Sequence, residues 1–252
     1  SSFLCFNPDF PYLRFLLVLL SVKYSSGMPK RIRRKVTTVR EHPLRVPVSK
    51  KNPSGITIRD RHLRRLRGTY LDAAEIASIF RNYDRKGIFH PTAGKLNKYK
   101  NADKYDEAIA VWTDYFNKKF NANPPLDPDV VKALIASESS FNPDPSRNRK
   151  IALGIAQITK KTLKILQDPN GEAKEFIFKD IRQKDLKDPH ISIPMAVRWL
   201  HRKRETAANQ LKHVPDNEEV ILEYKGLLKS DIKLKNEALE IYRSHYELLK
   251  NK

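Results

Sequence analysis

A regular spacing of apolar residues is the feature that most limits the folds open to this chain. In the segment 103–120, apolar side chains recur at every third or fourth position: Ile109, Trp112, Tyr115 or Phe116, and Phe120. This period is typical of a helix that buries one face. We expect further helices over 72–82, 128–139, 154–167, 190–211, 216–226 and 232–250. No segment shows sustained strand alternation, so the sequence predicts an all-α fold.

Positive charge is concentrated in an N-terminal arm. The formal net charge of the chain is +20, and residues 28–67 hold fourteen Lys or Arg against two acids, which places +12 on this segment. Prolines at four positions interrupt any regular element: Pro29, Pro43, Pro47 and Pro53. We expect a largely irregular, solvated arm over 28–70, with at most a short basic helix from Thr57 to Leu66. Such an arm suits anionic envelope polymers, and nucleic acid is a less favoured partner.

The first 27 residues allow two interpretations. The apolar run 15–22 follows Arg14 and has the size of a signal-peptide core, but it is too short to span a bilayer. Lys23 and Tyr24 stand where a cleavage site needs small residues, and Met28 offers an alternative start. Residues 1–27 are therefore a degenerate signal peptide or an upstream segment that is not translated. We slightly prefer the second interpretation, and the export route stays open.

Cysteine and histidine usage argues against a metal site or an intrachain disulfide. Cys5 is the single cysteine, and the seven histidines lack the spacing of metal ligands. We therefore expect no cofactor and no metal. We also expect a solvated surface position for four histidines that lie in charged or turn-like stretches: His42, His62, His201 and His213.

The predicted helix over 128–139 carries a glutamate in its last turn. Asp127 and Pro128 form a favourable helix start. An apolar face follows at Val131, Leu134 and Ile135, and Glu138 continues the same line. A carboxyl group at the end of a buried stripe is partly removed from water, which favours its protonated form and suits a general acid for glycosidic cleavage. On spacing alone, however, a capping or solvated glutamate is the more frequent explanation.

A series of short motifs follows in a set order. They are ESSFNP at 138–143, ALGIAQI at 152–158 with Thr162, Asp188-Pro189, Ser192-Ile193, AVRWL at 196–200, EYKG at 223–226 and Ile241-Tyr242. As a set, these motifs resemble the catalytic domain of soluble lytic transglycosylases, a goose-lysozyme-like family, over roughly residues 103–252. The chain departs from the family at Ile155-Ala156 (Leu-Met in the family), at Lys225 (asparagine), and in a longer insertion at 168–188.

The resemblance implies a lysozyme-like helical domain over 103–252, preceded by a helical linker segment over 71–102. It implies cleavage of the β-1,4 bond between N-acetylmuramic acid and N-acetylglucosamine in peptidoglycan glycan strands, leaving a 1,6-anhydromuramyl end. Glu138 would be the single catalytic carboxylate. By the same resemblance Ser139, Gln157 and Tyr224 would bind substrate or orient Glu138, and Gly154 would allow a close backbone approach at a helix start.

The resemblance further implies a bacterial or phage protein of the cell envelope or periplasm, with a phage or secretion apparatus as a further partner. Two alternatives stay open: a goose-type lysozyme that hydrolyses the same bond, and a catalytically weak envelope-binding or nucleic-acid-binding protein on the same fold. The departure at Lys225 bears on activity, because an ammonium close to Glu138 would favour the ionised carboxylate. Its neighbours Glu223 and Lys229 are charged, so we expect Lys225 to face solvent.

Overall fold

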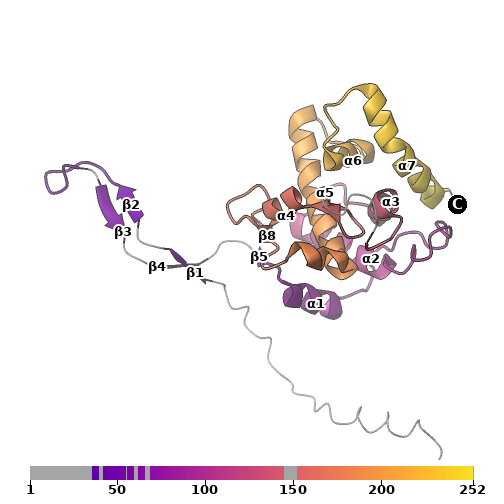
Figure 1. The fold of residues 1–252 in the computed structure, drawn as a ribbon, viewed down its shortest axis with the longest axis horizontal. Coiled ribbons are helices and arrows are strands. Elements are labelled where there is room, and N and C mark those ends of the chain that lie inside the picture. The colour runs from indigo at the N-terminus through magenta and orange to yellow at the C-terminus, as the bar shows by residue number, and fades with distance from the viewer. Residues whose placement is uncertain are drawn as a thin grey trace, which may run out of the picture.

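The computed structural model describes residues 36–39, 42–54, 56–59, 62–65, 69–144 and 152–251. The predicted signal-like segment 1–27 lies outside these residues. Figure 1 shows a helical body and, leading into it, a narrow arm of short strands. The helices are α1 (Ala73–Asn82), α2 (Asp106–Phe120), α3 (Pro128–Ser139), α4 (Lys160–Gln167), the 3-10 helix η1 (Gln183–Lys187), α5 (Pro189–Leu211), α6 (Asn217–Lys225) and α7 (Ile232–Lys250). The predicted all-α class of the body is confirmed.

The arm contains antiparallel strands where we expected irregular chain and a helix. β1 (Val36–Val39) pairs with β4 (His62–Arg65), and β2 (His42–Arg45) pairs with β3 (Ile56–Arg59). A bridge between Ser49 and Asn52 lies between β2 and β3. The predicted helix over Thr57–Leu66 is therefore wrong. The β-branched residues of VTTV in β1 and ITI in β3 favour extended backbone. Each strand of a two-stranded sheet also has one unpaired edge, and such an edge tolerates a proline such as Pro43.

The predicted helix over 154–167 is also shorter than expected. Residues 152–159 form a small hairpin, in which β6 (Ala152–Leu153) pairs antiparallel with β7 (Ile158–Thr159), and α4 begins only at Lys160. Gly154 and Gln157 adopt φ angles of 75° and 49°, and this left-handed backbone cannot propagate a right-handed helix. The Thr159 side chain then caps α4 by accepting a hydrogen bond from the Thr162 amide.

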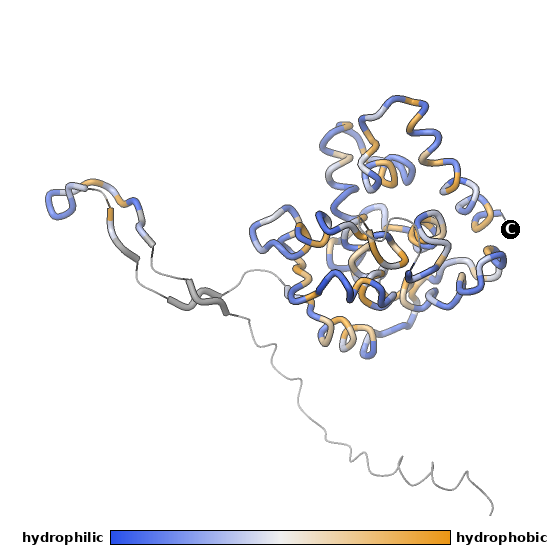
Figure 2. Tube along the Cα trace, in the orientation of Figure 1, coloured by the Kyte–Doolittle hydropathy of each residue, from blue (hydrophilic) through white to orange (hydrophobic). Residues whose placement is uncertain are grey.

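One core joins the helices of the body. Along α5, buried apolar residues recur at helical spacing: Ile193, Ala196, Val197 and Leu200. Figure 2 shows this pattern in the other helices of the body, where hydrophobic and hydrophilic residues alternate along each tube. α5 packs against α2 and α6, and α3 packs against α7. No helix in the described part of the chain combines the length and apolar character that crossing a bilayer requires.

The segment 71–102, which we expected to be a linker, shares this core. Leu71, Ile76 and Leu96 are buried among the residues of the helical body. Just before it, β5 (Thr69–Tyr70) pairs in parallel with β8 (Phe176–Ile177), a strand within the 168–188 insertion. The longer insertion therefore has a structural partner in the segment that precedes the predicted catalytic domain.

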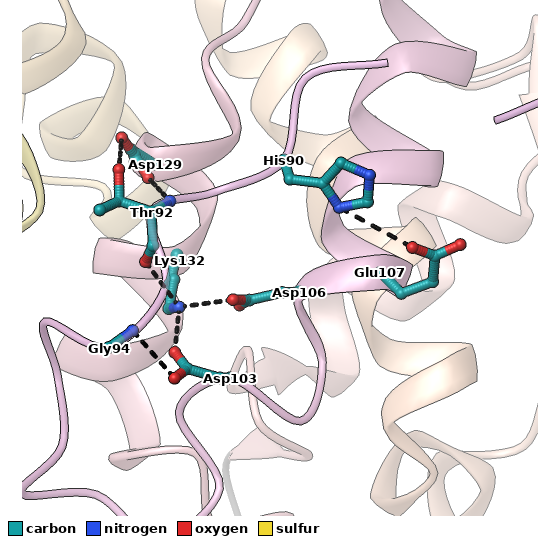
Figure 3. A network of polar contacts seen from close by, with 8 residues as sticks. All are labelled: His90, Thr92, Gly94, Asp103, Asp106, Glu107, Asp129 and Lys132. Carbon is teal, nitrogen blue, oxygen red and sulfur yellow. Dashed lines mark hydrogen bonds and ion pairs between the residues drawn. The ribbon is translucent and has the colours of Figure 1, made fainter. Parts of the chain in front are cut away.

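A buried lysine ties this segment to α3. The Lys132 side chain is fully buried, and its ammonium donates to Asp103 Oδ1 at 2.6 Å, to Asp106 Oδ2 at 2.8 Å and to the Thr92 carbonyl at 2.9 Å. Asp129 accepts hydrogen bonds from the amide and the hydroxyl of Thr92. Figure 3 shows these side chains converging from α3, from α2 and from the loop before it. The network fixes α3 relative to α2.

One of the predicted surface histidines lies inside the protein. His201 is 5% exposed on α5, beside the rings of Phe116 and Phe120. Burial lowers the pKa of His201 to about 3, with a smaller contribution from nearby arginines, so the ring is neutral at ordinary pH. The surface prediction is wrong for His201 because α5 crosses the core, whereas His213, beyond the end of that helix, is exposed.

Candidate active site

Glu138 lies in the last turn of α3. The Asp127 side chain accepts a hydrogen bond from the Asp129 amide and starts the helix, as predicted. The helix ends because Ser140 and Phe141 adopt left-handed φ angles of 54° and 60°. The predicted apolar stripe is fully buried at Val131, Leu134 and Ile135. Glu138 continues it with a side chain that is 17% exposed, so the carboxyl group is partly shielded from water.

The closest partner of Glu138 is Lys225. The Lys225 ammonium donates a hydrogen bond to Glu138 Oε1, and the Lys225 side chain is 18% exposed. The prediction that Lys225 faces solvent is therefore wrong. Lys225 is the last residue of α6, and Gly226 closes that helix with a φ of 74°. The expected surface setting is absent because Glu223 is itself buried and pairs with Lys203 of α5 at 3.2 Å.

Hydroxyl groups from α3 and α6 hold the turn between β6 and β7. Ser139 Oγ donates to the Ile155 carbonyl at 2.7 Å, and Tyr224 Oη donates to the Ala156 carbonyl at 2.8 Å. Burial raises the pKa of the Tyr224 phenol, and the charge of Glu138 raises it further, so the hydroxyl keeps its proton. Ser139 follows Glu138 in the chain and Tyr224 precedes its partner Lys225, and both hydroxyl groups are directed to the turn.

Gln157 and Gly154 shape the same turn. Gln157 Nε2 donates to the Gly154 carbonyl at 2.8 Å, and the Gln157 amide donates to the same oxygen at 3.1 Å. A Cβ atom on Gly154 would lie 2.0 Å from the Leu186 carbonyl oxygen. The predicted close backbone approach at Gly154 is confirmed, but it occurs in a hairpin turn and not at a helix start. The five predicted site residues therefore gather around one turn and the ends of two helices.

Replacing Gly154 with alanine should destabilise the protein and reduce activity, because the new methyl group collides with η1 backbone and the residue keeps a left-handed φ of 75°. We expect a loss of about 2 kcal/mol or more in unfolding free energy, measured by urea titration. Gly87→Ala is the matched control. Gly87 has a φ of 73° but open space around it, so it isolates the backbone strain. Equal losses in the two variants would contradict the collision.

Other acids near the predicted site act as caps or surface partners. Asp144 pairs with Lys187 at 2.9 Å, Asp168 accepts from the Asn170 amide, and Asp188 caps α5 by accepting from the His190 amide. In the described part of the chain, no group of three His, Cys, Asp or Glu side chains has the arrangement of a metal site. One surface pocket lies between α1 and the start of α5, and another lies between α2, the start of α3 and the end of α7. Neither Glu138 nor Lys225 lines these two pockets.

Comparison with known families covers this region. The family model of the transglycosylase SLT domain matches residues 114–230. The match runs from within α2 to just beyond α6, and it includes Glu138, the β6–β7 turn and Lys225. It confirms the resemblance that the motifs indicated. No curated protein matches the chain.

Proposed function

We propose that this chain is a lytic transglycosylase, because the family model of the transglycosylase SLT domain, a family that degrades peptidoglycan, matches residues 114–230. The bond cleaved is the β-1,4 linkage between N-acetylmuramic acid and N-acetylglucosamine, and the product carries a 1,6-anhydromuramyl end. The observation that carries the proposal is the position of Glu138. Its carboxyl group is partly shielded from water at the end of a buried stripe, beside the turn that both neighbouring helices hold.

One carboxyl group suffices for this reaction. Protonated Glu138 donates its proton to the glycosidic oxygen as the bond from that oxygen to C1 of the muramyl residue breaks. The C6 hydroxyl oxygen of the same residue then bonds to C1, and the Glu138 carboxylate takes the hydroxyl proton. The nucleophile is tethered to the reacting sugar, so no second carboxylate has to aim a water molecule. This fits the cap and surface roles of Asp144, Asp168 and Asp188.

Mass analysis of digested peptidoglycan tests the proposal. We expect purified sacculi to release muropeptides with anhydro ends, which are lighter by one water than hydrolysis products. Reducing ends in their place would identify a goose-type lysozyme activity and overturn the transglycosylase assignment. Absence of any released muropeptide over a range of pH would favour a binding protein that has kept the fold.

We further propose that the basic arm attaches the enzyme to anionic polymers of the cell envelope, where its substrate lies. The +12 charge of residues 28–67 provides a long-range attraction that salt screens. Binding to anionic cell walls should fall steeply between about 0.05 and 0.5 M salt. Deleting residues 28–67 should abolish this binding but leave cleavage of short soluble glycans nearly unchanged. Loss of cleavage on short glycans would place the arm in the substrate site, and stronger retention on DNA than on cell walls would identify nucleic acid as its partner.

A further inference from the structure

The last helix, α7, exposes a line of large apolar side chains. In the described part of the chain, half of the exposed large apolar side chains lie on this one helix: Ile232, Leu234, Ile241 and Leu248. Leu234, Ile241 and Leu248 are 46%, 56% and 43% exposed, and they follow one another at intervals of seven residues. Seven residues are almost two turns of a helix, so these three side chains form one line along it, which we call the α7 line.

The α7 line is separate from the side chains that α7 buries in the body. Leu239, Tyr242 and Leu249 are buried, and α7 packs against α3 and α6. Figure 1 shows α7 at the outer edge of the helical body. Single exposed apolar side chains are ordinary on a protein surface, but a seven-residue spacing is the one by which a helix packs along a second helix. Within the described chain, α7 therefore presents an uncovered line with the pattern of a helix–helix contact.

The charges beside the α7 line are complementary to a second copy of the same helix running in the opposite direction. Two α7 helices that pack antiparallel about Ile241 place Leu234 of each copy against Leu248 of the other. Lys233 and Glu247 each stand one residue before these leucines, so they flank the same side of the line, and both are exposed. The antiparallel pair brings Lys233 of one copy beside Glu247 of the other at both ends of the contact. A parallel pair would instead bring lysine beside lysine and glutamate beside glutamate, which is unfavourable.

We propose that this chain forms a reversible homodimer in which two α7 helices pack antiparallel along the α7 line, with the two-fold axis at Ile241. A symmetric dimer uses the same patch on both subunits, and the α7 line meets this condition in its spacing and in its charges. The helix has 19 residues and is about 28 Å long, so the contact is smaller than the ~1,600 Å² buried in a standard stable interface. We therefore expect a dissociation constant on the order of 100 μM. The dimer does not depend on the proposed function.

Sedimentation velocity tests the dimer. We expect the average mass of the wild type to rise toward twice that of the chain as the protein concentration increases from about 10 to about 500 μM. Ile241→Glu should stay monomeric over this range, because it places two carboxylates together at the two-fold axis. Circular dichroism of each variant checks that the helices are intact. A wild type that stays monomeric at about 500 μM overturns the proposal.

The matched control is Ile232→Glu. Ile232 lies on α7 and is 72% exposed, but about two and a half helical turns separate it from Ile241, so it points away from the α7 line. This variant adds the same charge to the same helix and should dimerise as the wild type does. An equal loss of the dimer in Ile232→Glu and Ile241→Glu would assign the effect to added negative charge and contradict a contact along the line.

Disulfide trapping tests the direction of the two helices, in a Cys5→Ser background that removes the single native cysteine. Leu234→Cys and Leu248→Cys chains should cross-link when they are mixed and oxidised. Leu234→Cys alone should not, because about 21 Å of helix separates its two copies in an antiparallel pair. Ile232→Cys gives the background rate of random collision. Cross-linking of Leu234→Cys alone at the rate of the mixture would show a parallel pair and overturn the proposed arrangement.

Cleavage and binding assays distinguish a second copy from another partner. At submicromolar concentration the dimer is dissociated, so Ile241→Glu should cleave sacculi and bind cell walls as the wild type does. Equal cleavage by both proteins, or by neither, leaves the sedimentation result to decide on the dimer, so its failure and that of the proposed function are read separately. A monomeric wild type whose retention on cell walls falls in Ile241→Glu would assign the α7 line to an envelope component and overturn the dimer.

Discussion

Glu138→Gln should lower the rate of peptidoglycan cleavage by about 10²- to 10⁴-fold while the protein stays folded. Glutamine has nearly the shape of glutamate, and its amide oxygen can still accept the hydrogen bond from Lys225. The amide cannot give a proton to the glycosidic oxygen or take one from the C6 hydroxyl. Both halves of the proposed reaction therefore fail together, which is why we expect a large loss from one substitution.

The measurement is the initial rate of muropeptide release from sacculi, at the pH optimum of the wild type. Glu223→Gln is the control, because Glu223 is a comparably shielded carboxylate that pairs with Lys203 outside the proposed site. We expect its rate to stay within about twofold of wild type, since it contributes packing and charge but no reacting atom. A Glu138→Gln enzyme that retains a tenth of the wild-type rate would show that another group is the acid.

The helices could be predicted because their signals are local. Asp127 and Pro128 start α3, the buried stripe follows at fixed spacing, and the chain turns left-handed directly after Ser139. Each step depends on residues within one or two turns of each other. The position of Glu138 at the end of the stripe followed from the same reasoning, and the motifs downstream added the family.

Features that depend on distant pairing could not be predicted. The contact of Lys225 with Glu138 joins residues 87 positions apart, and nothing in the EYKG stretch reveals which side of α6 faces α3. The strands of the arm pair with segments further along the chain, so their β-branched residues alone did not predict a sheet without knowledge of the partner strand. Gln157 adopts a left-handed φ that a non-glycine residue rarely takes, and the helix predicted through it failed for that reason.

Lys132→Met should destabilise the protein by about 3 kcal/mol at neutral pH. Methionine fills a similar volume, but it removes the charge that compensates two carboxylates (Figure 3). Asp103 is 41% exposed, so water screens it and reduces its share of the loss. Asp106 is 13% exposed, and a carboxylate left there without a cation accounts for most of the expected cost. Urea unfolding at pH 8 measures the difference from wild type.

The pH dependence of this loss identifies its cause. Burial raises the pKa of Asp106 to about 6, against the lowering effect of Lys132, so the folded protein binds this proton more tightly than the unfolded chain does. Without Lys132 the carboxyl group takes up a proton even more readily. The destabilisation by Lys132→Met should therefore be smaller at pH 5 than at pH 8, and Asp106→Asn in the same chain should recover part of it at pH 8.

Lys118→Met is the control variant, because it removes an ordinary surface ion pair instead of the buried network. Lys118 is 64% exposed and pairs with Asp114 one helical turn away, so its loss should cost less than about 1 kcal/mol and vary little with pH. A comparable small cost for Lys132→Met would mean that water reaches Asp106 in the variant and replaces the ammonium. The larger, pH-dependent loss would instead show that the network holds α3, the helix that carries Glu138 in its last turn, against α2.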